Sequence, residues 1–247
     1  MKYQLSIIIP ILNEAETIEN LLNHLLKNSS KENIAEIIIV DGRSTDGSQD
    51  IVSQFCATSK DPESSSGLMS QVKTVLLDSP KGRAKQMNTG FKIATGSILY
   101  FLHADSFPPK DFDQYIVNEV EKGNQAGCFR LQFDHRHWWL RLASWLTQFD
   151  WRACRGGDQS QFIAKTLFED IGGFDENYII YEDNILINEL YKRKQFKVIN
   201  KKLITSARRY KQHGIWKLQY HFWTIYVKKW FGASSNELYA YYKKHIA

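Results

Sequence analysis

The chain has 247 residues, a mass of 28.8 kDa, 43% hydrophobic and 24% charged residues, and a formal net charge of +5. This length allows one large domain with its own core, and the composition excludes a disordered or fibrous protein. No apolar run reaches the ~18 residues of a transmembrane helix, no secretory leader is evident, and the three cysteines lack metal-ligand spacing, so we expect a cytoplasmic protein with free thiols.

The first hundred residues alternate between strand-like and helix-like segments. Four apolar runs have the composition of buried strands: 5–12, 34–40, 72–77 and 98–102. Helical spacing or helix-start signals follow the first three runs, at 15–27, 48–55 and 82–96. Residues 58–70 have the composition of a solvated loop. Repeated strand–helix units of this kind predict an α/β fold with a mostly parallel, Rossmann-like sheet flanked by helices.

The pattern after residue 105 is more mixed. Strands are expected at 126–133 and 159–164, and helices at 138–149, 182–194 and 214–231. Charge is also uneven, because the last 56 residues contain 14 basic residues and one acid, whereas the preceding 191 contain 18 basic and 26 acidic residues. The acidic body and the basic tail are therefore expected to meet different partners.

Four carboxylates lie where apolar runs end or a helix begins. Asp41 and Asp46 follow the second predicted strand, Asp105 follows the fourth, and Asp183 stands at the start of a predicted helix. Ligands of an open α/β sheet bind outside the carboxyl ends of its strands, so these groups are expected to converge. The chain has neither a G-x-G-x-x-G nor a G-x-x-x-x-G-K-[ST] motif, which leaves a divalent metal as the means of neutralising a diphosphate.

A series of short motifs carries a family resemblance. They are Ile9-Pro10 with Asn13-Glu14, residues 40–47 (Val-Asp-Gly-Arg-Ser-Thr-Asp-Gly), Gly82-Arg83-Ala84 with Gln86-Met87-Asn88 and Gly90, His103-Ala104-Asp105, Gly172-Gly173-Phe174-Asp175, and Glu182-Asp183. In order and spacing they resemble the family-2 glycosyltransferases, which have the GT-A fold, over about four-fifths of the chain.

The resemblance implies transfer of a sugar from a nucleotide-diphosphate sugar, linked to UDP or GDP, to an acceptor hydroxyl. Residues 1–205 would form a GT-A catalytic domain, with 1–105 as its nucleotide-binding half and 106–205 as its acceptor-binding half, and residues 206–247 would form a basic amphipathic helical tail. The residues implied in binding the donor are Pro10, Asn13, Glu14, Asp41, Ser44, Asp46, Arg83, Gln86, His103 and Asp105.

The resemblance also implies the chemistry. Asp105 and His103 would hold a divalent metal, Mn²⁺ or Mg²⁺, on the diphosphate. The family usually has an aspartate where this chain has His103, and an imidazole suits Mn²⁺ better than Mg²⁺, so the metal preference is open. Asp183 would be the general base that takes the proton of the acceptor hydroxyl, with Glu182 as its helper or rival. Inversion at the anomeric carbon follows by analogy with the family.

Several of these residues have a second interpretation. Asp46, in a Ser-Thr-Asp-Gly turn, is equally suited to capping the helix that follows. Asp158 and Gln159 lie in a segment that can hold hydroxyls of the acceptor or sugar, or can be a plain loop. Arg208 and Arg209 are interpreted first as solvated surface charges and second as clamps for a phosphate of donor or acceptor.

Two other functions are compatible with the sequence. One is a GT-A-like nucleotidyltransferase, and the other is a catalytically silent module that keeps the fold and binds a sugar or lipid. The first would need a Gly-rich, Arg-containing turn directly after the first strand, where this chain has Pro-Ile-Leu-Asn-Glu. The presence of both Asp105 and Asp183 argues against the second.

The basic tail contains a predicted amphipathic helix, residues 214–231. One face would carry Lys217, His221, Thr224 and Lys228, and the opposite face Ile215, Phe222, Trp223, Tyr226 and Trp230. Such a helix can dock its aromatic face on the catalytic domain, or it can lie in an anionic membrane interface, which attracts basic and aromatic residues. The second alternative predicts a lipid-linked acceptor and a peripheral location at the inner face of the membrane. No nucleic acid partner is expected, because no recognised binding module accompanies the charge.

Overall fold

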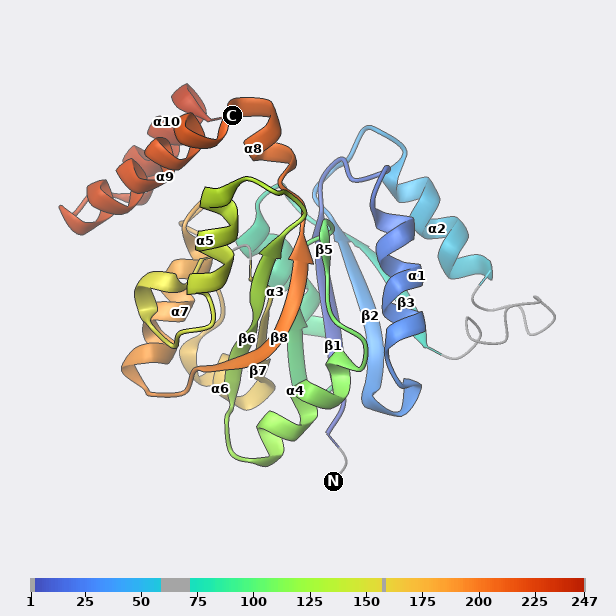
Figure 1. The fold of residues 1–247 in the computed structure, drawn as a ribbon. Coiled ribbons are helices and arrows are strands. Elements are labelled where there is room, and N and C mark those ends of the chain that lie inside the picture. The colour runs from blue at the N-terminus through green and yellow to red at the C-terminus, as the bar shows by residue number, and fades with distance from the viewer. Residues whose placement is uncertain (1–2, 59–71, 157–158, 247) are drawn as a thin grey trace.

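One mixed sheet organises the molecule (Figure 1). The computed structural model describes residues 3–58, 72–156 and 159–246. In the described ranges the sheet has eight strands in the order β3-β2-β1-β4-β7-β6-β8-β5. Their bounds are β1 (Leu5–Ile11), β2 (Ile34–Asp41), β3 (Lys73–Asp78), β4 (Ile98–Phe101), β5 (Ser106–Phe107), β6 (Ala126–Phe133), β7 (Gln161–Ala164) and β8 (Lys197–Thr205).

The two parts of the sheet differ in strand direction. Strands β1 to β4 are mutually parallel, because a crossover separates each of them from the next. Beyond β4 the sheet is mixed, since β7 runs antiparallel to both β4 and β6, β6 is parallel to β8, and β5 is antiparallel to β8. The α/β fold is confirmed, and its antiparallel share is larger than the periodicity of the sequence indicated.

Helices cover both faces of the sheet. One face packs against α1 (Ile18–Asn28), α2 (Ser48–Thr58) and α4 (Phe112–Glu121), and the other against α3 (Arg83–Ile93), α6 (Lys165–Ile171) and α7 (Glu182–Lys192). Strand β1 is buried throughout, and its side chains alternate between the two cores: Ile7 and Ile9 join the first, and Ile8 joins the second. The largely apolar run that predicted this strand is thus explained by burial on both sides.

Some elements were not expected from the sequence. The expected strands are present with ends that differ by a few residues, and α5 (Trp138–Leu146) ends before Phe149. Most of the expected loop at 58–70 lies outside the described residues. The elements that the sequence analysis did not assign are β5, β8, α4, α6, α8 (Arg208–His213), α10 (Ser235–His245) and the short 3-10 helices η1 (Lys31–Asn33) and η3 (Arg152–Cys154).

The tail forms three helices that sit beside the carboxyl ends of the strands (Figure 1). Helix α9 (Ile215–Trp230) pairs with α10, and the tail's single acid, Glu237, completes a capping box with Ser234 at the start of α10. Among the described residues, no helix has both the length and the apolar composition needed to cross a bilayer.

The expected division of α9 into one basic and one aromatic face is wrong. Ile215 and Phe222 pack against the core, together with the buried Leu218, whereas Trp223 and Trp230 are exposed. The reason is helical geometry: consecutive residues are turned by about 100°, so Trp223 cannot share the direction of Phe222. The apolar positions of α9 therefore form two stripes, one buried and one exposed.

Gly90 lets α3 approach the sheet closely, and we expect Gly90→Ala to destabilise the protein. A Cβ atom here would lie 2.6 Å from Ile8 Cγ2 and 3.2 Å from Val40 Cγ2. Both neighbours are β-branched residues in buried strands, so they cannot turn aside. Alanine favours a helix by about 1 kcal/mol, but overpacking costs about 1–3 kcal/mol, so the free energy of unfolding should fall.

Urea denaturation of Gly90→Ala measures this change. The control is Gly156→Ala, because among the residues that the structure describes its Cβ would meet nothing closer than Tyr226 Oη at 3.7 Å. A rise in the free energy of unfolding for Gly90→Ala would mean that helix propensity outweighs the close contact and that α3 can move away from the sheet.

Candidate active site

A cleft of about 760 Å³ opens at the carboxyl ends of β1 and β4 and extends beneath the tail helices. This volume is typical of sites for small organic ligands. Its charged and titratable lining residues include Glu14, Lys81, Arg83, His103, Asp105, Asp183, Arg208 and Arg209. Its apolar and aromatic lining residues include Ile179, Ile180, Tyr181, Leu218, Phe222, Ile225, Tyr226, Tyr239 and Tyr242.

The structure brings together most of the residues that the sequence motifs singled out. Those that line the cleft are Pro10, Glu14, Arg83, Gln86, His103, Asp105, Asp183, Arg208 and Arg209. Those that are described but do not line it are Asn13, Asp41, Ser44, Asp46, Gln159 and Glu182. Asp158 lies outside the described residues.

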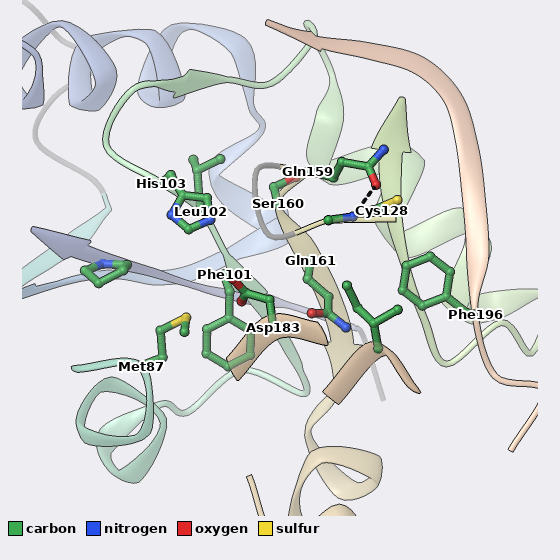
Figure 2. A pocket seen from close by; sticks show the side chains of 13 residues that line it. Met87, Phe101, Leu102, His103, Cys128, Gln159, Ser160, Gln161, Asp183 and Phe196 are labelled. Carbon is green, nitrogen blue, oxygen red and sulfur yellow. Dashed lines mark hydrogen bonds between the residues drawn. The ribbon is translucent and has the colours of Figure 1, made fainter. Parts of the chain in front are cut away.

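A smaller hollow of about 10 Å³ adjoins the cleft and shares Pro10, His103, Gly156 and Asp183 with it (Figure 2). Gln159, expected to contact the acceptor, lines this hollow and is buried. In the orientation that satisfies both ends of its amide, the nitrogen donates to the Cys154 carbonyl and the oxygen accepts from Arg155 Nη1, each at 3.2 Å, so the amide is engaged with its own loop. Contact between Gln159 and an acceptor remains a prediction.

The Asp41 carboxylate organises the turn after β2. It is fully buried and accepts hydrogen bonds from the N–H groups of Arg43 and Ser44, both at 2.9 Å. The Ser44 hydroxyl and the Gln49 side-chain amide also donate to it. Three of these donors are on Oδ2 and the Ser44 hydroxyl is on Oδ1, and together they accompany Arg43 at a φ of 71°. A contact between Asp41 and a nucleotide base remains a prediction, since the carboxylate is buried and engaged in its own turn.

Asn13, Ser44 and Asp46 connect the loops after β1 and β2. The Asn13 N–H donates to Ser44 Oγ at 2.9 Å, and the Ala15 N–H donates to Asp46 Oδ2 at 2.9 Å. Asp46 also accepts from the N–H of Ser48, the first residue of α2, at 3.1 Å. Asp46 therefore has the contacts of a helix-capping group, one of its two interpretations.

Gln86 ties α3 to the ends of two strands. Its Nε2 donates to the carbonyl oxygens of Ile11 and Val40, each at 2.8 Å, and the side chain is buried. These bonds use both amide hydrogens, so only its Oε1 remains to accept from a ligand. Its expected role in donor binding stays a prediction, and its evident role is to fix the start of α3 beside the cleft.

Arg83 and the acidic pair of α7 form the charged centre of the site. Helix α7 begins at Glu182, after Tyr181 in the left-handed region with a φ of 73°. Arg83 Nε lies 2.7 Å from Glu182 Oε1, and Arg83 Nη2 lies 3.8 Å from Asp183 Oδ2. The Arg83 side chain is 40% exposed, that of Asp183 10%, and that of Glu182 not at all. Of the two acids, therefore, only Asp183 reaches the cleft.

We expect the metal-free protein to lose stability through Glu182 as the pH rises from about 5 to 8. Burial raises the pKa of Glu182 from 4.5 to about 7, and Asp183 adds to the rise although Arg83 opposes it. Between these values the folded protein holds a proton that the unfolded chain has released, so raising the pH favours unfolding. The contribution of this one group is at most about 3 kcal/mol.

Urea denaturation of wild type and Glu182→Gln over this pH range isolates the effect. Glutamine keeps the shape but cannot titrate, so the free energy of unfolding of wild type relative to the variant should fall as the pH rises. A difference that stays constant with pH would mean that Glu182 is ionised throughout.

The two tail arginines are engaged rather than simply solvated. Arg208 Nη2 donates to Glu14 Oε1 at 3.0 Å, which links α8 to the loop after β1, and this bond raises the pKa of Arg208. Arg209 Nη2 donates to the Tyr242 hydroxyl at 2.9 Å and lies over the Phe222 ring. Both arginines line the cleft, so they can also face a phosphate there.

His103 and Asp105 could supply part of the coordination shell of a divalent metal. Both line the cleft directly after β4, and in proteins Mg²⁺ commonly takes one or two carboxylates and completes its shell with substrate phosphates and water. No group of three or more His, Cys, Asp or Glu residues arranged to hold a metal occurs in the described ranges. The chain would thus supply part of a coordination shell and the donor diphosphate the rest.

Sequence reasoning missed the aromatic lining of the cleft. Tyr181 and Tyr226 lie with ring centroids 5.3 Å apart, and Phe222 also lines the cleft. The helical spacing of the tail placed Phe222 and Tyr226 on an apolar face, but it gave no sign that this face meets the catalytic cleft. Tyr181 has no signal of its own beyond its place before the acidic pair.

The comparisons with known proteins identify the family. The sequence profile of Glycosyl transferase family 2 matches residues 6–174. The chain belongs to this family. The resemblance that the sequence motifs indicated is thereby confirmed.

The matches to named relatives cover only part of the length of those proteins. Glycosyltransferase AglE of Haloferax volcanii is 33% identical over 115 residues, which are 47% of this chain and 34% of AglE. Undecaprenyl-phosphate 4-deoxy-4-formamido-L-arabinose transferase of Proteus mirabilis is 26% identical over 142 residues, 57% of this chain and 41% of that protein. The chain thus spans less than half the length of these curated relatives.

A solved structure shares the fold. Mannosyltransferase PcManGT from Pyrobaculum calidifontis, in complex with GDP-Man and Mn²⁺, superposes with a TM-score of 0.66 at 18% identity. The match covers 98% of this family-2 chain and 70% of the mannosyltransferase. The likeness confirms the expected GT-A fold.

Proposed function

We propose that this family-2 glycosyltransferase moves a sugar from a UDP- or GDP-linked donor to a hydroxyl group, with inversion and with Asp183 as the general base. The observation that carries the proposal is the shared cleft, in which Asp183 faces groups from the ends of β1 and β4 and from α3. The mannosyltransferase of the same fold binds GDP-Man with Mn²⁺, which supports a nucleotide sugar and a divalent metal here.

In the proposed reaction the acceptor O–H gives its proton to Asp183 as its oxygen forms a bond to the anomeric carbon. The bond from that carbon to the diphosphate breaks, and the diphosphate leaves with the electron pair. A divalent cation held by Asp105 and His103 would neutralise charge on the departing diphosphate. Arg83 adds a fixed positive charge beside the same cleft.

We further propose a lipid-linked acceptor and a peripheral position at the inner face of a membrane. The apolar residues that line the cleft, which include Ile180, Phe222 and Ile225, support a lipid chain as part of the acceptor. The name of the Proteus mirabilis relative refers to undecaprenyl phosphate, which adds support.

The test is release of nucleoside diphosphate from a panel of UDP- and GDP-sugars with Mn²⁺, with and without polyprenyl-phosphate-linked sugars in detergent. We expect one donor to be consumed only when the lipid acceptor is present. Equal release with soluble glycans would reject the lipid acceptor. If no donor is consumed and none raises the melting temperature of the protein, the nucleotide-sugar function is rejected.

A further inference from the structure

All seven tryptophans of the chain lie in two short segments, 138–151 and 216–230. Six of them have large exposed fractions, from 48% at Trp223 to 84% at Trp230. Tryptophan is usually well buried, and a concentration of exposed tryptophans on a soluble protein marks an interaction surface.

The exposed residues of α9 form one continuous stripe. Trp216, Tyr220, Trp223, Val227 and Trp230 are separated by four, three, four and three residues, so they follow one side of the helix along its whole length. The core-packing stripe, which includes Leu218 and Ile225, points elsewhere. The exposed stripe is therefore distinct from the stripe that packs into the core, although its Trp216 and Trp223 also contact Trp139 of α5, with ring centroids 5.4 and 5.7 Å away.

Helix α5 extends this surface. Its exposed Trp138, Leu142 and Trp145 have the spacing of one helical face. The ring centroids of Trp138 and Trp216 are 5.6 Å apart, so the stripes of α5 and α9 meet at these residues. We define the tryptophan face as Trp138, Leu142 and Trp145 of α5 with Trp216, Tyr220, Trp223, Val227, Trp230 and the adjacent Phe231.

Charge identifies the kind of partner. Helices α5 and α9 contain no Asp or Glu, and their basic residues include Arg141 and Lys217, both exposed. Lys228 and Lys229 stand near the end of α9. Tryptophan with lysine and arginine, without acids, is the composition of a helix lying in the interface of an anionic bilayer.

We propose that the tryptophan face binds the interface of an anionic lipid bilayer, with α5 and α9 lying in its plane. The core-packing side of α9, including Leu218 and Phe222, lines the cleft, so the bilayer would be about one helix diameter, ~10 Å, from this part of the cleft. The inference deepens the peripheral membrane position and rests on the proposed function for delivery of a lipid acceptor, but binding to lipid can be tested separately, because it requires neither donor nor acceptor.

The test uses the full chain and vesicles of phosphatidylcholine with or without phosphatidylglycerol. Since every tryptophan lies in or beside the face, intrinsic fluorescence reports directly: emission should shift to the blue and be quenched by brominated lipid. We expect Trp230→Ser with Phe231→Ser, both highly exposed, to lower partitioning by at least about tenfold. Ile93→Ser with Ile204→Ser, exposed positions on α3 and β8, is the matched control and should bind like wild type.

A charge-reversed variant, Arg141→Glu with Lys217→Glu, should lose the preference for anionic vesicles while its tryptophans still respond at high lipid concentration. Absence of binding at every lipid composition would overturn the proposal. A second result would also overturn it: sedimentation shows a dimer, its tryptophan emission is already blue-shifted without lipid, and the double variant Trp230→Ser with Phe231→Ser is monomeric. The tryptophan face would then join two copies of the chain. The double variant does not alter residues that line the cleft, so its turnover of a detergent-dispersed acceptor should equal that of wild type. Loss of lipid binding with unchanged turnover would separate the failure of this inference from a failure of the proposed function.

Discussion

Replacing Asp183 by asparagine should lower the rate of sugar transfer by ~10²–10⁴-fold and leave donor affinity unchanged. Asparagine keeps the shape of the side chain but cannot accept the proton of the acceptor hydroxyl. Asp183 lines the cleft at the start of α7, and its contact with Arg83, at 3.8 Å, is long enough that losing its charge should not displace the guanidinium. Single-turnover rates with a saturating donor, beside donor titration by calorimetry, separate the two quantities.

Two further variants on the same helix make the test decisive. Glu189→Gln removes a half-buried acid outside the cleft that pairs with Arg193 at 3.0 Å, and it should transfer sugar at the wild-type rate. Glu182→Gln should have a smaller effect than Asp183→Asn, because Glu182 is fully buried and acts on the cleft only through Arg83. A rate loss in Glu182→Gln that exceeds the loss in Asp183→Asn would assign the base to Glu182.

The place of the site could be predicted because parallel strands leave few alternatives. Asp41 ends β2 and Asp105 follows β4, and strands of one parallel sheet bring such residues to a common edge. The largely apolar runs before them indicated the strands themselves, since each strand is buried on both faces. For β2 and β4, therefore, the apolar sequence of the strand and its buried place in the sheet lead to the same assignment.

The partners of individual side chains could not be predicted in the same way. Whether Asp41 faces a ligand or its own turn depends on the backbone of Arg43, which adopts a positive φ that its residue type does not signal. Gln86 binds carbonyl groups at the ends of β1 and β2, 75 and 46 residues away in the chain. Such contacts follow from the packing of α3, not from the motif that contains Gln86.

The tail shows the same limit on a larger scale. The helical period of α9 was evident, but its apolar residues occur on more than one side of the helix. Only the docking of α9 on the body decides which of these sides is buried. Strand β8 was missed because its parallel partner, β6, is about 70 residues earlier, and its lysines obscure the apolar alternation. Helix α10 depends on α9 for burial of Leu238 and has little apolar pattern of its own.

Replacing Asp105 by asparagine should remove the Mn²⁺-dependent part of UDP or GDP binding and leave the fold intact. Asp105 lines the cleft directly after β4 and has the charge that a hard divalent cation requires. Loss of an outer-shell partner alone commonly costs ~10–100-fold in metal affinity, so loss of a ligand should cost at least as much. Calorimetry of the nucleoside diphosphate with and without Mn²⁺ measures the effect, and circular dichroism verifies the fold.

Asp78→Asn is the matched control, because Asp78 is an exposed acid at the carboxyl end of β3 that does not line the cleft. It should bind the nucleotide and metal like wild type, and unchanged metal-dependent affinity in Asp105→Asn would remove Asp105 from the site. His103→Asn then addresses the metal preference: an imidazole ligand favours Mn²⁺ over Mg²⁺, so its loss should weaken nucleotide binding with Mn²⁺ more than with Mg²⁺. Equal losses with the two metals would instead place His103 against the nucleotide, where an imidazole can hydrogen-bond a ribose or phosphate oxygen.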